Sequence, residues 1–238
     1  MTNKNKIAIF LAARSGSKRL PNKHFLAINS NLRVIDLCIL RLKKTKLVNK
    51  IFLCTTKKKE DDKFKDICKL HKIELFRGST NDVAKRIIDC AKENSIKTIV
   101  RVTADCPLID PKIVDECIKL HLNKKNDYTS NVLKLSFPDG MDVEVIDLDI
   151  LIKSQKISKS KYNKEHVTFF VKKSKLFKKY NYKNFIDYSN RRWTLDNLDD
   201  YFFLIKVVSY FSKNFFFSWR DLIKAEKYKK SLINIKER

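Results

Sequence analysis

The chain has 238 residues, six cysteines and a formal net charge of +25. A chain of this length buries an ample core, so we expect a single domain over residues 1–238 that needs no disulfide bonds. The cysteines include no Cys-x-x-Cys pair, which argues against a zinc or redox motif, and no apolar run reaches the roughly 18 residues of a membrane-spanning helix. We therefore expect a cytoplasmic protein with no membrane partner.

The positive charge is spread along the whole chain. Basic residues occur from Lys43 to Lys236 without the aromatic-interleaved stripe or the known module of a nucleic-acid reader. Lysine abounds whereas glycine occurs only three times, which indicates a general bias in composition. We therefore expect no nucleic-acid partner and keep a basic nucleic-acid-binding protein as the less favoured alternative.

A buried strand followed by a cationic loop opens the chain. Residues 7–12 are apolar on both alternating faces, which predicts a central strand covered on two sides. Ligands of open α/β sheets bind at the carboxyl ends of the strands, and Gly16 permits a positive φ or a close approach of a ligand there. The loop is therefore predicted to bind an anion, the alternative being a solvated basic loop. Its basic residues are Arg14, Lys18, Arg19 and Lys23.

Short apolar runs then alternate with amphipathic segments, which predicts a mostly parallel α/β sheet. We expect helices over 33–46, 61–71 and 81–93, and strands over 51–55, 73–76 and 98–103. Ser79 or Thr80 is expected to cap the helix over 81–93. Arg77 and Ser79 lie at the carboxyl end of a strand, where they either form an ordinary turn or approach a ligand.

Asp105 follows the strand over 98–103 directly. An acidic residue at the end of a central strand, beside a proline, is well placed to hold magnesium on bound phosphates. The alternative is a cap or turn aspartate, but Asp110 and Pro111 already supply the cap and first turn of a helix that runs to about Leu122. Asp105 is thus our first choice for a metal ligand.

The pattern changes after residue 127. Strands over 127–133 and 142–146, joined by a loop, predict an antiparallel excursion, in which Asp142 and Glu144 share one face. These carboxylates either bind sugar hydroxyls or form a solvated face. Helices are expected over 148–154 and 164–173, and residues 172–183 read as a surface hairpin or loop. A short strand over 191–196 is expected to end at Asp196, before helices over 198–211 and 219–230.

Several motifs in series resemble the cytidylyltransferases that make CMP-activated acidic sugars. These are the CMP-Kdo and CMP-acylneuraminate synthetases and, most of all, the relatives named after spore coat polysaccharide biosynthesis. The sequence departs from CMP-Kdo synthetases at Asn22, where those enzymes typically have glycine. The motifs are AARSGSKRLPNK (12–23), RVTADCPLID (101–110), DYTSN (127–131), FPDGMDVEVI (137–146), EHVTFF (165–170) and RWTLDNLDDY (192–201).

The resemblance implies a three-layer α/β/α sandwich of the nucleotide-diphosphosugar transferase type. Its sheet would be mostly parallel, with an antiparallel insertion at about 128–190 that serves as the contact of a homodimer. The nucleotide would be bound by Ala12, Ala13, Arg14, Ser15, Gly16, Ser17, Lys18, Arg19, Lys23, Arg77, Ser79 and Arg86. Asp105 and Asp196 would hold Mg²⁺, although Asp196 could simply cap a helix. Arg14, Lys23 and Asp105 would carry the catalysis.

The implied reaction transfers CMP from CTP to an acidic sugar and releases pyrophosphate, in surface polysaccharide biosynthesis. The sugar would be bound by Gly140, Asp142, Glu144, His166 and Arg192. Without the resemblance, Gly140 would be a turn residue and His166 a structural one. Arg192 shares a strand face with Asp196, and its planar fork matches a carboxylate. The closest rival is a glycosyltransferase of similar fold, whose metal motif normally pairs two aspartates around one residue.

Overall fold

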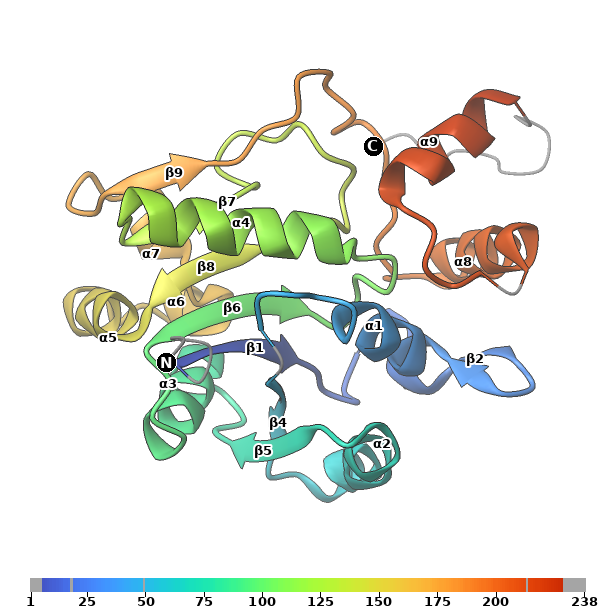
Figure 1. Ribbon diagram of the computed structural model, residues 1–238. Coiled ribbons are helices and arrows are strands. Elements are labelled where there is room, and N and C mark those ends of the chain that lie inside the picture. Colours follow the sequence, from blue (N-terminus) through green and yellow to red (C-terminus); the bar gives the residue numbers. More distant parts are fainter. Residues whose placement is uncertain (1–5, 18, 49, 213, 229–238) are drawn as a thin grey trace.

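Figure 1 shows the computed structural model, which describes residues 6–17, 19–48, 50–212 and 214–228. Its central sheet has seven strands in the order β5-β4-β1-β6-β8-β7-β9. The strand β8 is antiparallel to both β6 and β7, whereas every other pair is parallel, so one reversed strand separates two parallel groups. The strands are β1 (Ile7–Ala12), β4 (Ile51–Thr56), β5 (Glu74–Gly78), β6 (Thr98–Thr103), β7 (Tyr128–Ser130), β8 (Glu144–Asp147) and β9 (Lys179–Asn181).

The strand β1 lies in the middle of the sheet and contributes to two separate cores. Ile9 and Leu11 pack into one hydrophobic cluster, whereas Ala8 and Phe10 pack into the other. Because successive side chains of a strand point to opposite faces, both faces of the sheet are covered. The predicted three-layer α/β/α sandwich is thereby confirmed.

Nine helices and a small hairpin surround the sheet in the described part of the chain. The first cluster contains side chains of α1, α2, α4, α8 and α9, and the second contains side chains of α3, α5 and α7. The helices are α1 (Val34–Leu42), α2 (Phe64–His71), α3 (Val83–Glu93), α4 (Pro111–Lys124), α5 (Leu148–Ile157), α6 (Lys161–His166), α7 (Phe169–Lys173), α8 (Leu198–Phe211) and α9 (Trp219–Tyr228). The 3₁₀ turn η2 (Lys23–Phe25) precedes the hairpin, which consists of β2 (Ala27–Asn29) and β3 (Leu32–Arg33). The 3₁₀ turn η3 (Lys59–Lys63) precedes the helix α2.

Two predicted helix starts are wrong. The helix expected over 61–71 begins as η3, and the α-helix itself starts at Phe64. Asp82 caps α3, since its carboxylate accepts from the Lys85 amide, whereas the Ser79 hydroxyl accepts from the Asp82 amide one turn earlier. The predicted cap of α4 at Asp110 is confirmed.

The region after β8 differs most from the expectation. The helix predicted over 164–173 is two short helices, because Val167 adopts a left-handed φ of 52° and ends α6. Residues 172–183 are not a surface loop, since β9 pairs with β7 and forms an edge of the central sheet. The antiparallel excursion is confirmed, with β8 starting only at Glu144.

Residues 191–196 form no strand among the described residues; they contribute one isolated bridge between Asp139 and Arg192. Gly140 lies beside this bridge with a φ of +104°, and an added Cβ would stand 2.9 Å from the carbonyl carbon of Trp193. Asp196 does not cap α8, because Asn197 and Asp200 form its capping box. The single domain and the dimer contact at 128–190 stay predictions.

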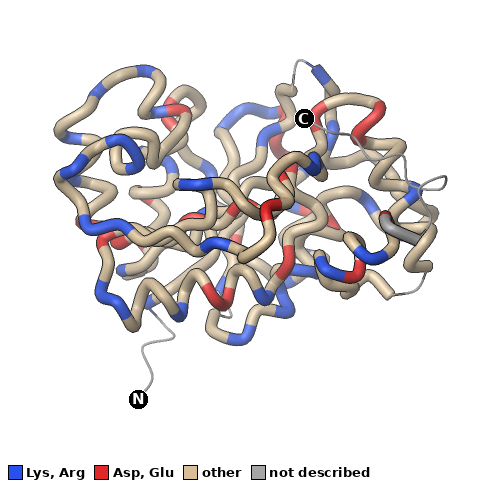
Figure 2. Tube along the Cα trace, turned by 90° about the horizontal axis from the view of Figure 1, so that it is seen from above, with Lys and Arg blue, Asp and Glu red and all other residues tan. Residues whose placement is uncertain are grey.

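The distribution of charge agrees with the sequence. Lysine and arginine are scattered over the trace in Figure 2 rather than gathered in one stripe. No helix within the described residues is both long and apolar enough to cross a membrane.

Arg41 joins α1 to segments far along the chain. The residue is 1% exposed, and its guanidinium donates to the carbonyl oxygens of Ile109 (2.8 Å), Phe215 (2.6 Å) and Phe217 (3.0 Å). Burial lowers the pKa of Arg41 to about 10, which still leaves it charged near neutral pH. This side chain therefore connects α1 to the turn before α4 and to the segment that precedes α9.

Replacing Arg41 by Met should destabilise the fold by about 3 kcal/mol, because buried carbonyl oxygens lose their donors. Urea unfolding followed by circular dichroism measures the change. The exposed Arg220 is the matched control, and Arg220→Met should stay within about 0.5 kcal/mol of the wild type. Equal effects of the two substitutions would contradict the role of Arg41.

Candidate active site

A cleft of about 600 Å³ lies at the carboxyl ends of β1 and β6. It collects residues from the loop after β1, from η2, α3, β6 and α6, and from the segment before α8. Sites at this edge are typical of α/β sheets. Its lining residues are Ala12, Ala13, Arg14, Gly16, Ser17, Arg19, Lys23, His24, Val83, Arg86, Arg101, Thr103, Asp105, Glu165, His166 and Asp196.

Lys23 lies at the centre of the polar contacts of this cleft. Its ammonium nitrogen Nζ is 3.1 Å from Oδ2 of Asp105 and 3.0 Å from Oδ1 of Asp196, and it donates to the carbonyl oxygen of Leu195 at 2.8 Å. The backbone supports this arrangement, since the Leu195 amide donates to the Asp105 carbonyl. The two aspartates predicted to share a cation therefore lie side by side.

Cationic side chains face both aspartates. Burial alone would raise the pKa of Asp105, but the charge of Lys23 and a hydrogen bond from Thr103 hold it below its ordinary value. Asp196 is in addition 3.1 Å from Nη2 of Arg19. The cleft therefore holds two carboxylates whose negative charge is balanced by cationic side chains.

The aspartate pair fits a magnesium ion bound together with phosphates. Mg²⁺ in phosphate-transferring sites is usually held by one or two carboxylates, with water and phosphate oxygens as the other ligands. The described residues include no cluster of three or more His, Cys, Asp or Glu side chains suited to a metal. Asp105 and Asp196 would thus supply the protein share of the ligands, and the remainder would come from the nucleotide and water.

Backbone carbonyl groups of two neighbouring segments position the side chain of Arg86. The Nε group donates to the Ser79 carbonyl at 2.9 Å, and Nη1 lies 3.4 Å from the Cys54 carbonyl. Arg86 is 2% exposed, and its Nη2 has no partner among the described residues. Gly78 permits this course, because a Cβ there would stand 2.7 Å from Cγ of Arg86. A buried donor without a partner lines the cleft.

Other residues of the predicted nucleotide site differ from the expectation. Arg77 points away from the cleft, where it donates to the carbonyls of Thr56 and Lys58 and pairs with Asp62. The Ser15 amide and hydroxyl bind Asp61 and the Glu60 carbonyl, so Ser15 fastens the loop to η3. Gly16 lines the cleft without a left-handed φ. Lys18 lies outside the described residues.

The loop after β1 is connected to α6 across the cleft. Nη2 of Arg14 is 3.0 Å from Oε1 of Glu165, and the two side chains are 50% and 42% exposed. His166 also lines the cleft, and its ring lies 4.1 Å from that of Tyr162. Glu165 belongs to a motif that the sequence singled out, but nothing in the sequence indicated its partner.

The predicted sugar residues do not form one group. Gly140 is a turn residue next to Trp193, and Arg192 pairs with Asp196 and Asp200, each at 2.8 Å. The fork of Arg192 is thus occupied by carboxylates of the protein itself. Arg192 does lie on the same side as Asp196, as the alternation predicted, although residues 191–196 are not a strand.

Glu144 belongs to a buried network instead of a solvated face. It is 2% exposed, accepts from Tyr128 at 2.6 Å and pairs with Arg101 and with Lys172 at 3.2 Å. Burial raises its pKa, but the charges of Arg101 and Lys172 outweigh burial and lower the pKa to about 2. Asp142 precedes β8, which begins at Glu144, and the charges of Glu144, Lys172 and Arg101 all act on its carboxyl group.

The sequence analysis missed several lining residues, including His24, Arg101 and Thr103. His24 is 4% exposed, and burial followed by the charge of Lys23 lowers its pKa to about 4, so the ring is neutral. Its Nδ1 has no partner within the described part of the chain. His24 and Thr103 each lie within two residues of Lys23 or Asp105, which is the signal that could have found them.

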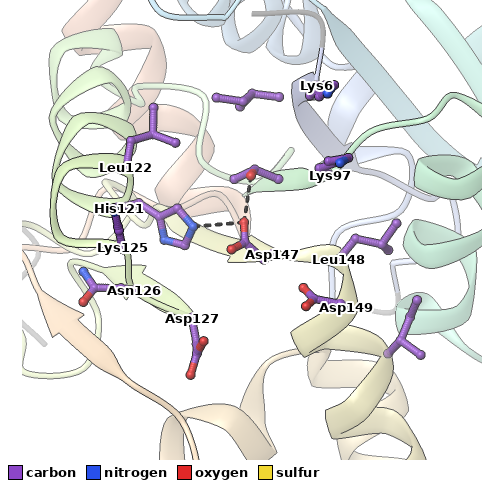
Figure 3. A pocket seen from close by; sticks show the side chains of 13 residues that line it. Lys6, Lys97, His121, Leu122, Lys125, Asn126, Asp127, Asp147, Leu148 and Asp149 are labelled. Atoms are coloured by element: carbon purple, nitrogen blue, oxygen red, sulfur yellow. Dashed lines mark hydrogen bonds and ion pairs between the residues drawn. The ribbon is translucent and has the colours of Figure 1, made fainter. Parts of the chain in front are cut away.

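A second cavity, of about 700 Å³, lies at the opposite end of β1 and β6 (Figure 3). His121 and Asp147 point toward one another there, with 3.2 Å between Nε2 and Oδ1, and the Thr98 hydroxyl donates to the same oxygen at 2.7 Å. These polar groups satisfy each other. The cavity is also at the amino ends of the parallel strands, away from the usual ligand side, so the cleft is the better candidate.

A mostly parallel α/β/α sheet, with a basic loop after its first strand and two aspartates at the same edge, defines a nucleotidyltransferase. The chain matches the cytidylyltransferase family over residues 8–227 and belongs to that family. The sequence is 30% identical to the spore coat polysaccharide biosynthesis protein SpsF of Bacillus subtilis, over 71% of this chain and 70% of that protein. The expected resemblance is thereby confirmed.

Solved structures agree with this assignment. A cytidylyltransferase from Leptospira borgpetersenii is 37% identical, covers 96% of each chain and superposes with a TM-score of 0.91. A CMP-2-keto-3-deoxy-manno-octonic acid synthetase complexed with CTP superposes with a TM-score of 0.65 over 86% of this chain and 99% of its own, at 12% identity. The second comparison shows the fold alone.

Replacing Asp105 by Asn should abolish turnover while the protein stays folded. The amide keeps the size of the side chain but removes the charge that faces Lys23 and that would hold a divalent cation. Turnover is measured as pyrophosphate release and folding by circular dichroism. The matched control is Asp89→Asn, which removes a carboxylate from an exposed pair on α3. Wild-type turnover in folded Asp105→Asn would end the metal assignment.

Asp142 should make stability depend on pH. Burial, and then the charges of Asp139 and Glu144, raise its pKa from 3.8 to about 7. The folded protein therefore holds this proton up to about pH 7, whereas the unfolded chain releases it near pH 4, so the contribution of Asp142 to stability falls as the pH rises between these values. Asp142→Asn removes this loss. Relative to wild type, the variant should gain urea resistance on going from pH 5 to pH 8, and a pH-independent difference would contradict the shift.

Proposed function

We propose that the protein transfers CMP from CTP to an acidic sugar and releases pyrophosphate. The acceptor would be a Kdo- or nonulosonate-like acid, and its activated form would enter surface polysaccharide biosynthesis. One observation carries the proposal. A cleft in a cytidylyltransferase fold brings a basic loop and two aspartates around a single cationic position.

The chemistry asks for charge neutralisation and positioning. Attack of a sugar hydroxyl on the α-phosphate of CTP needs no side-chain nucleophile, and the protein lowers the barrier by stabilising charge on the phosphates. Arg14, Arg19 and Lys23 line the side of the cleft from which phosphates would be gripped. Mg²⁺ held by Asp105 and Asp196 would supply further positive charge when it is bound.

Arg86 is the side chain that we assign to the cytosine base. Its Nη2 group is buried and has no partner among the described residues, and Arg86 lines the cleft. The carbonyl oxygen and ring nitrogen of cytosine are hydrogen-bond acceptors, so a bound base would need such a donor. The positions of Ser79 and Gly78 fix its course. Ser79 would thus act on the nucleotide through Arg86.

The preference for an acidic acceptor is supported by two observations. A structure of the same fold is that of a synthetase for a keto-sugar acid, complexed with CTP. In this chain, Arg101 lines the cleft, and its Nε has no partner among the described residues although its Nη1 pairs with Glu144. We therefore assign the sugar carboxylate to Arg101 in place of Arg192, whose fork is occupied, and His166 lines the same cleft.

Pyrophosphate release tests this function. We expect release from CTP and Mg²⁺ only when a keto-sugar acid such as Kdo is present, and little release from UTP. Arg86→Met should lower kcat/KM for CTP by about 10- to 100-fold, the scale of a lost charged hydrogen bond. Arg77→Met is the matched comparison, because Arg77 lies outside the cleft, and it should retain near wild-type kcat/KM. Equal use of neutral sugars would contradict the acidic acceptor.

A further inference from the structure

The ammonium group of Lys23 is completely satisfied by the protein. A lysine ammonium has three N–H donors, and Lys23 has three acceptors, at 2.8 Å (Leu195 carbonyl), 3.0 Å (Asp196) and 3.1 Å (Asp105). The residue is 8% exposed. In this state Lys23 has no hydrogen left for a phosphate oxygen.

The two described arginines of the loop also face carboxylates of the protein. Arg19 faces Asp196 at 3.1 Å, and Arg14 faces Glu165 at 3.0 Å. A triphosphate that enters this cleft therefore meets cations that are already neutralised. For Lys23 to bind a phosphate, the two aspartates must first receive a different positive partner.

Lys23 occupies the position between the carboxylates that a shared divalent cation would need. An ammonium and a divalent cation that share the same carboxylate oxygens repel each other, so each weakens the binding of the other. Without any cation between them, two carboxylates this close would repel each other. Lys23 thus keeps the pair together and competes with a metal ion for the same two oxygens.

We propose that Lys23 is an internal substitute for the divalent cation, displaced by the metal and then available to the nucleotide phosphates. This inference rests on the proposed function, since it assumes that the aspartates hold a metal. Its consequence is a coupling between the two ligands. Without nucleotide, the metal must displace Lys23 from the aspartates. Without metal, the phosphates must displace the aspartates from Lys23. When both ligands bind, the aspartates hold the metal and Lys23 is available to the phosphates. Such coupling is reciprocal by thermodynamic necessity.

Binding of Mn²⁺ to the metal-free protein, followed by electron paramagnetic resonance, tests the displacement directly. Without nucleotide, Lys23→Met should bind Mn²⁺ at least about 10-fold more tightly than wild type, and Lys23→Met with Asp105→Asn should lose this gain. Lys63→Met is the matched control, because Lys63 contacts the same loop at Asn22 without touching either aspartate. It should bind Mn²⁺ as the wild type does.

The coupling itself is measured with a CTP analogue that cannot react. The analogue should tighten Mn²⁺ binding by wild type at least about 10-fold, and by much less in Lys23→Met. The unmodified protein provides an independent test if Lys23→Met does not fold. Acetic anhydride should label Lys23 slowly in metal-free protein and faster with Mn²⁺ alone, as read by mass spectrometry. An unchanged rate of labelling would overturn the displacement.

The failure of this inference differs from the failure of the proposed function. Equal Mn²⁺ affinity in wild type and Lys23→Met overturns the displacement, whatever the pyrophosphate assay shows. Tighter Mn²⁺ binding by Lys23→Met, combined with no pyrophosphate release from CTP and any keto-sugar acid, supports the displacement and overturns the proposed reaction.

Discussion

One ammonium group between two aspartates connects three parts of the chain that are far apart in sequence. Lys23 follows β1, Asp105 follows β6, and Asp196 precedes α8. The backbone hydrogen bond from Leu195 to Asp105 brings the last segment to the edge of the sheet. A nearly buried ammonium is costly unless it is paired, so the fold at this edge depends on the carboxylates of Asp105 and Asp196. The same demand creates the binding site.

The reversed strand β8 extends this dependence on paired charges to the insertion at 128–190. Glu144 begins the strand and is buried with Arg101 of β6 and Lys172 of α7. Loss of Glu144 would leave the largely buried charge of Arg101 without its carboxylate, which is expensive. The network thereby holds α7 against the sheet, and α6, which precedes it, presents Glu165 and His166 to the cleft. The insertion is thus coupled to the nucleotide loop through charge as well as through packing.

The parts that the sequence predicted are those with a local cause. Apolar runs with turn residues after them identify β1 and β6, and an aspartate at the end of a strand identifies Asp105. The failures involve distant partners. The strand β9 forms because β7 offers an unpaired edge, although its own residues are polar. Arg77 and Arg86 are equivalent as sequence, and only the neighbours of each decide which one reaches the cleft.

The ion pairs of the cleft differ in how easily they exchange. Arg14 and Glu165 are both largely exposed, and such pairs contribute about 0–1 kcal/mol. A phosphate can therefore replace Glu165 at little cost. The contacts of Lys23 are mostly buried, and its departure would remove the cation that Asp105 and Asp196 share, leaving Asp196 with Arg19 and Arg192. Replacing Glu165 as the partner of Arg14 thus needs only an anion. Replacing the aspartates as the partners of Lys23 needs a cation for the aspartates as well.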